Sequence, residues 1–248
     1  MGNVRPPDPR RRLIFDASGI DWSDDGSIDR WAQYVWQQAT DEWGKDMNET
    51  PSTVLTDNYT EAIAYAARKH GQQPRKGNEI PYMAHLLGVS SLVLEAGGTE
   101  TEAIAALLHD AVEDQGGMAT HAEIAEQFGS RVAEIVLACS DSTDAETKAT
   151  QDYLERKHLY LMHLEASTDE RSVMVSIADK VHNARAIVTD LQVHGYGVLT
   201  KFNGTPGEIL YYYVECLRIG RLKNVPDELL WPLDNAVRVI AEYVLRGA

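Results

Sequence analysis

The sequence AALLHDAVED, at residues 105–114, places an apolar run directly before one histidine and three carboxylates. Read as a helix, it buries its apolar residues on one side. The four polar side chains then fan over an arc of roughly 140°: His109, Asp110, Glu113 and Asp114. Burial of unpaired charge is costly, and a bound cation removes that cost. The cluster therefore favours a metal site facing an interior cleft, with a solvated helix end as the alternative.

The acidic composition narrows the classes of ligand. The chain has 248 residues, 44% of them hydrophobic, with 38 acidic against 23 basic side chains and a formal charge of −15. This length suggests one domain of ordinary size with a sizeable core. General binding to nucleic acid or to an anionic membrane needs basic surface, so neither is expected. An anionic substrate would need a local basic patch.

We divide the chain at residue 56. Residues 1–12 are polar and rich in proline and arginine, which predicts disorder and no signal peptide. The rest of this N-terminal extension is acidic and contains four of the five tryptophans. A helix there either packs onto the main domain or offers a surface to a protein partner or a second copy, because aromatic residues dominate interface hot spots. Residues 57–248 form the main domain.

From residue 57 onward the chain reads as helix after helix, so we predict an all-α fold. The pair Thr99 and Glu102 marks one helix start. Further expected elements are a loop at 141–150 and helices over about 150–165, 170–193 and 232–246. No run approaches ~20 apolar residues, so we expect no membrane span and a cytoplasmic protein. Cys139 and Cys216 read as reduced core thiols.

Two further stretches belong with the first one. Residues 75–85 read RKGNEIPYMAH, and residues 177–183 read IADKVHN. In chain order the potential ligands are His85, His109 with Asp110, and Asp179, which resembles the H…HD…D pattern of the HD phosphohydrolase superfamily. Two imidazoles and two carboxylates suit a divalent ion and leave positions open for water and a phosphate oxygen. Without an ion, a core histidine or a capping aspartate would explain each residue singly, but not the ordered set.

The finer resemblance is to the hydrolase domain of the RelA/SpoT alarmone enzymes, especially the standalone small alarmone hydrolases. It covers about residues 57–213 and rests on Arg75-Lys76-Gly77, Pro81-Tyr82 with His85, the LLHD and VED segments of residues 107–114, and Ala178-Asp179-Lys180 with Asn183. The resemblance implies an all-α HD-domain bundle. It also implies that His85, His109, Asp110 and Asp179 bind manganese or another divalent cation.

The resemblance also implies the catalytic residues and the nucleotide contacts. Glu113 and Asp114 would position or deprotonate the attacking water, or supply a proton to the leaving group. Arg75 and Lys76 would contact the nucleotide, since arginine stacks on a base and lysine meets phosphate charge. Residues 62–78 hold four basic side chains and no acidic one, which is the required basic patch. A solvated turn is the alternative.

Two softer substrate contacts follow from the same resemblance. Asn183 lies one turn beyond Asp179, and its family counterpart contacts the nucleoside; an exposed asparagine is the alternative. Tyr213 falls where relatives carry an aromatic residue near the ligand, although core packing would explain it equally well. Arg156 and Lys157 are either surface charges or phosphate ligands.

The implied function is hydrolysis of the 3′-pyrophosphate of guanosine tetraphosphate-like alarmones, the nucleotides of the stringent response, to a nucleoside 5′-diphosphate and pyrophosphate. Two alternatives stay open: another HD nucleotide phosphohydrolase, or a non-catalytic nucleotide-sensing module. The sequence departs from the family at residues 115–118, at His182 and in the N-terminal extension. The first two departures concern base and phosphate selectivity rather than the metal site.

Overall fold

The central element of the fold is the long helix α10 (Glu170–His194), which carries one of the expected metal ligands. Asp169 caps its first turn by accepting a hydrogen bond from the backbone N–H of Arg171. Every residue from 172 to 181 is buried, which a helix achieves only when neighbours cover it on all sides. The helix packs against α3, α4, α7, α11 and α12.

In this computed structural model the described residues are 53–77, 79–140 and 153–247. Besides α10, the helices in these ranges are α2 (Asp57–His70), α3 (Met83–Glu95), α4 (Glu100–Leu108), α5 (Ala111–Asp114), α6 (Met118–Phe128), α7 (Ser130–Cys139), α9 (Tyr153–Ala166), the 3-10 helix η1 (Tyr196–Lys201), α11 (Pro206–Leu222) and α12 (Asp227–Gly247). The predicted all-α fold is confirmed. The expectations for the Trp-rich extension and the loop at 141–150 lie outside the described residues.

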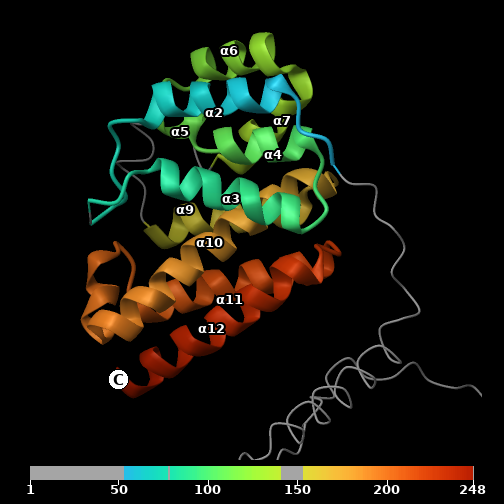
Figure 1. The fold of residues 1–248 in the computed structure, drawn as a ribbon. Coiled ribbons are helices and arrows are strands. Elements are labelled where there is room, and N and C mark those ends of the chain that lie inside the picture. The colour runs from blue at the N-terminus through green and yellow to red at the C-terminus, as the bar shows by residue number, and fades with distance from the viewer. Residues whose placement is uncertain (1–52, 78, 141–152, 248) are drawn as a thin grey trace, which may run out of the picture. The chain divides into compact units, whose positions relative to one another are not determined.

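The helices lie on two sides of α10, as Figure 1 shows. Helices α2 to α7 gather on one side, and α11 and α12 lie on the other. The buried side chains form one continuous core that includes Cys139 and Cys216, both free thiols as expected. Within the described part of the chain, no helix is long and apolar enough to cross a bilayer.

The helix predicted through residues 105–114 is interrupted at His109 and Asp110, so that expectation was wrong in detail. Helix α4 ends at Leu108, and the short α5 begins at Ala111. Nδ1 of His109 donates to the carbonyl oxygen of Ala106, the group that the next N–H would bind in a continuous helix. The break places the histidine and aspartate at a turn between two helices.

The last helix was also predicted too short. It begins at Asp227 rather than near residue 232, and Pro232 lies inside it. The first turn closes through N–H groups of Leu229 and Leu230 onto the carbonyl of Pro226.

Candidate metal centre and catalytic site

Three helical segments bring together one buried cluster of possible metal ligands. His85 comes from the first turn of α3, His109 from the end of α4, and Asp179 from the middle of α10. One ligand atom from each of them lies within 4.8 Å of the others, and all three residues are buried. Nε2 of His85 is 3.2 Å from Oδ1 of Asp179, and Nε2 of His109 is 3.6 Å from the same oxygen.

The Asp110 carboxylate lies beside this cluster. Its Oδ2 lies 2.9 Å from Nε2 of His109 and 3.7 Å from Nε2 of His85. Donor atoms held at about 2.1 Å from one ion lie about 3.0–3.4 Å apart in octahedral or tetrahedral geometry. The spacing of His85, His109 and Asp179 therefore fits a single divalent ion, and the Asp110 carboxylate lies beside them, close to both histidines.

The ring of His109 gives a direct test of that fit. Its Nδ1 must carry the proton, because it lies 2.8 Å from the carbonyl oxygen of Ala106, which only accepts. In the neutral ring Nε2 then holds a lone pair. This atom is buried without a hydrogen-bond partner, although Oδ2 of Asp110 is close. A lone pair aimed at carboxylates is repulsive unless positive charge lies between them, and either a second ring proton or a bound cation supplies that charge. With imidazole and carboxylate donors together, the residues fit a divalent cation.

Burial by itself would lower the pKa of His109, but the carboxylates of Asp110 and Asp179 outweigh it and raise that pKa well above its usual value. Without an ion the ring would therefore carry a second proton on Nε2, and a bound cation would take the place of that proton. Burial would raise the pKa of both carboxyls, yet His109 holds the pKa of Asp110 well below its usual range, and Lys180 does the same for Asp179. Both aspartates are therefore ionised at neutral pH and available as ligands.

Two contacts that the sequence did not reveal orient the aspartates. The hydroxyl of Tyr82 donates to Oδ2 of Asp110 at 2.5 Å. The buried ammonium of Lys180 pairs with Oδ2 of Asp179, which leaves Oδ1 directed at the two histidines. Tyr82 and Lys180 belong to the motif segments, but Tyr82 lies 28 positions before Asp110 and Lys180 directly follows Asp179. The geometry of both contacts is defined only in the folded chain.

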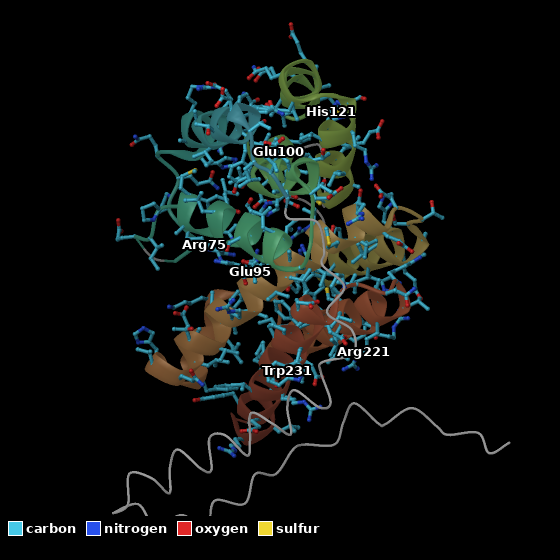
Figure 2. All side chains as sticks on the ribbon, turned by 45° about the vertical axis from the view of Figure 1, so that its right-hand side comes forward. Arg75, Glu95, Glu100, His121, Arg221 and Trp231 are labelled. Atoms are coloured by element: carbon cyan, nitrogen blue, oxygen red, sulfur yellow. The ribbon has the colours of Figure 1, made fainter. Side chains whose placement is uncertain are left out.

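The predicted substrate residues Arg75 and Asn183 are brought next to the cluster. Nη2 of Arg75 donates to Oδ1 of Asn183 at 2.7 Å, and Nδ2 of Asn183 donates to Oδ1 of Asp179 at 2.5 Å. The Arg75 guanidinium also lies 5.7 Å from the centre of the Tyr82 ring. The guanidinium of Arg75, which Figure 2 labels on the loop between α2 and α3, is therefore linked by two hydrogen bonds to Asp179, a potential metal ligand.

The loop that carries Arg75 is fixed by its own backbone. The N–H of Arg75 bonds the carbonyl of Ile80, and an isolated bridge pairs Pro74 with Pro81. Lys76 is exposed, with its ammonium 3.3 Å from Oδ1 of Asn203. The loop therefore presents two basic side chains beside the cluster.

The predicted catalytic pair lies on α5, directly after the ligand turn. Glu113 is half-buried and Asp114 is exposed. Oδ2 of Asp114 accepts a hydrogen bond from Nε2 of Gln73 at 3.0 Å. Asp114 also lines an open pocket of about 450 Å³ whose other walls are polar: Lys69, Gln72, Gln73 and Gln115.

The remaining sequence candidates differ in their surroundings. Tyr213 is buried; burial and then the nearby charge of Asp179 raise the pKa of its hydroxyl. Lys157 lies with its ammonium 4.8 Å from the ring centre of Tyr212. His182, one of the departures from the family, contacts His85, and its pKa is lowered to about 4, mainly by burial and then by its neighbours His85 and Arg75.

Comparisons with known proteins agree with this picture. A family model described as "HD domain" matches residues 62–196. The guanosine-3′,5′-bis(diphosphate) 3′-pyrophosphohydrolase of Aquifex aeolicus is 35% identical over 126 residues, which is 51% of this chain and 17% of that protein. The enzyme of that activity named MESH1 from Xenopus tropicalis is 39% identical over 128 residues, covering 50% of this chain and 66% of the relative.

A solved structure reported as a metazoan ortholog of SpoT that hydrolyzes ppGpp superposes with a TM-score of 0.59 at 32% identity, over 75% of this chain and 97% of that one. A Listeria monocytogenes protein, lmo0812, superposes with a TM-score of 0.51 at 26% identity, over 63% of this chain and 96% of that one. The GTP pyrophosphokinase of Myxococcus xanthus is 33% identical over 51% of this chain. This chain spans only 17% and 16% of the Aquifex and Myxococcus proteins.

Proposed function

This chain belongs to the HD-domain family, and from that membership we propose that it is a metal-dependent 3′-pyrophosphohydrolase of guanosine tetraphosphate-like alarmones. One observation carries the proposal: Arg75 is joined through Asn183 to Asp179 of the metal cluster. A phosphohydrolase acting on simple phosphates needs no cation tied to its metal ligand in this way. Relatives that bear the name of this activity support the choice of substrate.

We assign the metal to His85, His109, Asp110 and Asp179, whose imidazole and carboxylate donors suit a divalent ion, and we propose manganese because the resemblance to the alarmone hydrolases implies it. When bound, a divalent ion supplies Lewis acidity that lowers the pKa of a water molecule and offsets phosphate charge. Tyr82 and Lys180 hold the two carboxylates in place through their own contacts. The chain's residues thereby fix where the water and the phosphate meet.

In the proposed reaction, the oxygen of water attacks the phosphorus bonded to the 3′-oxygen. The bond between that phosphorus and the 3′-oxygen breaks. The leaving 3′-oxygen takes a proton, and the products are the nucleoside 5′-diphosphate and pyrophosphate. Glu113 and Asp114 orient the water and move the proton, because they follow the ligand turn by three and four residues. Arg75, Lys76 and Asn183 hold the nucleotide, and Tyr213 is a further proposed contact with it.

Three features of the proposal concern the chain as a whole. We place the protein in the cytoplasm, where nucleotides of this class are available as substrates. The domain boundary at residue 56 stays a prediction. A protein partner or a second copy bound through residues 1–56 also stays a prediction, because those residues lie outside the described ranges.

The proposal is tested by turnover of a nucleotide panel with manganese. The panel contains guanosine tetraphosphate, nucleotides with a single 2′-, 3′- or 5′-phosphate, and GTP. We expect fast turnover of the 3′-diphosphorylated nucleotide alone. Arg75→Ala should raise KM strongly because it removes nucleotide binding, whereas Arg238→Ala, an exposed arginine on α12, should not.

Preferred turnover of a simple phosphate would support a different HD phosphohydrolase. Nucleotide binding without any turnover would support a sensing module. Either result would replace the alarmone assignment.

A further inference from the structure

His182 contacts a metal-ligating side chain from outside the cluster. Its Nδ1 lies 3.0 Å from Nδ1 of His85, with the two rings tilted by 63° and their centres 4.8 Å apart. The two residues come from α10 and α3, 97 positions apart. The opposite nitrogen of His85, Nε2, faces Asp179. His85 therefore lies between the metal cluster and His182.

The number of protons on the His85 ring decides which of the two histidines donates the hydrogen bond. A neutral imidazole carries one proton, and a nitrogen that binds a metal offers its lone pair. If Nε2 of His85 binds the ion, its single proton is on Nδ1. The contact with His182 is then a hydrogen bond from Nδ1 of His85 to the lone pair on Nδ1 of His182. Metal-binding histidines commonly use such a bond to fix their tautomer and ring orientation.

The fold makes room for His182 at this place. The ring lies against the backbone of Gly88, three residues after His85 on α3. A Cβ atom at position 88 would lie 2.4 Å from Cδ2 and Nε2 of the His182 ring. Any side chain there would displace the imidazole, so the glycine and the histidine form a matched pair.

We propose that His182 is a positioning residue that accepts the Nδ1 proton of His85 and holds His85 in the tautomer that binds the metal. This inference rests on the proposed metal site, and it gives His182 a role in metal affinity rather than in the choice of base. A residue acting on the nucleotide would change KM. A residue acting through His85 changes the affinity for the ion, and it does so without any nucleotide present.

The experiment measures the affinity of the full chain for Mn²⁺ alone by isothermal titration calorimetry. His182→Phe fills the same space without an acceptor, and it should weaken manganese binding by about 10–100-fold. His182→Gln keeps an acceptor oxygen and should recover much of that loss. His194→Ala removes an exposed histidine from the end of the same helix and should bind manganese like the wild type.

Gly88→Ala provides a second, independent route, because it leaves the imidazole in the chain but takes its space. It should weaken manganese binding in the same direction as His182→Phe. At saturating manganese, KM for guanosine tetraphosphate should stay near the wild-type value in both variants.

Wild-type manganese affinity in His182→Phe, or a raised KM at saturating metal, would overturn the inference. Equal losses in His182→Phe and His182→Gln would also overturn it, since an acceptor would then not matter. A loss of affinity in a protein that turns over no alarmone would support the inference and reject only the proposed substrate. A wild-type chain that binds no manganese would reject the inference together with the metal site.

Discussion

Nε2 of Gln73 lies 3.0 Å from Oδ2 of Asp114 and donates a hydrogen bond to it across 41 positions of the chain. The other end of the same amide, Oε1, accepts from Nε2 of Gln115 at 2.8 Å and lies 2.8 Å from Nδ1 of His70. Because an amide oxygen only accepts, Nδ1 of the buried His70 carries a proton. The amide oxygen of Gln73 is thus fixed by Gln115 and His70, and its amide nitrogen orients the carboxylate of Asp114, one of the proposed catalytic residues.

This contact predicts a specific effect of Gln73→Leu. The variant removes the hydrogen bond from Gln73 to the Asp114 carboxylate, so kcat should fall about tenfold, in keeping with the loss of one hydrogen bond to a charged group. Manganese affinity should not change, because the side chain of Gln73 bonds to Asp114, Gln115 and His70 rather than to a proposed metal ligand. Gln72→Leu is the matched control: it changes an exposed glutamine in the same pocket and should leave kcat unaltered. Steady-state kinetics of both variants decide the point.

Glu113→Gln separates chemistry from binding. The carboxylate is proposed to act on the water only as the reaction proceeds, so kcat should fall by roughly 10²–10⁴-fold while metal and nucleotide affinities stay nearly constant. Single-turnover kinetics together with manganese calorimetry would measure both. Normal turnover in this variant would show that the pair is structural and would favour the sensing function.

Asp110→Ala should remove the metal. The variant deletes one of the four oxygen and nitrogen donors and leaves Nε2 of His109 buried without the nearest carboxylate. We expect about one divalent ion per wild-type chain and a large loss in the variant, measured by elemental analysis after dialysis against manganese. Glu95→Ala, an exposed carboxylate at the end of α3, is the control. Equal metal content in wild type and Asp110→Ala would refute the ligand assignment.

The cap of α10 predicts a pH-dependent contribution to stability. Asp169 accepts from the N–H of Arg171 and pairs with Arg131 at 2.7 Å, and that ion pair lowers the pKa of Asp169 to about 2. A pKa lowered by folding means that the contribution is complete above about pH 4 and is lost as the pH falls toward 2. Asp169→Ala should therefore lower the free energy of unfolding by about 1 kcal/mol at pH 7.

Urea unfolding at several pH values checks this prediction. The difference between wild type and Asp169→Ala should shrink below pH 4. Glu126→Ala, an exposed carboxylate on α6, should change stability by less than about 0.5 kcal/mol throughout. A difference for Asp169→Ala that is constant with pH would show that the ionised carboxylate is not what stabilises the helix start.

The all-α fold could be predicted from the sequence because apolar periodicity and capping residues are local signals. The segment at 170–193, for example, matches α10 almost to the residue. The break after Leu108 could not be predicted, since it depends on the side chain of His109 competing for a backbone carbonyl. Pattern alone does not distinguish a helix that continues from one that ends at such a contact.

Part of the candidate site could likewise be predicted from the sequence, and part of it could not. The four potential ligands could be proposed because their residue types and order resemble the H…HD…D pattern of the HD phosphohydrolases, and such donors suit a divalent ion. The contacts that orient them could not. Tyr82, Gln73 and His182 each act on a residue far away in the sequence, and their roles depend on distances that exist only in the folded chain. His182 in particular looked like a determinant of selectivity until its contact with His85 was known.

The central claim is that the enzyme cleaves the bond between the 3′-oxygen and its phosphorus. The most direct measurement is the identity of the first products from guanosine tetraphosphate with manganese, separated by ion-exchange chromatography at early times. The account predicts GDP and pyrophosphate released in equal amounts. Orthophosphate as the first product, or no reaction with any 3′-diphosphorylated nucleotide, would contradict it.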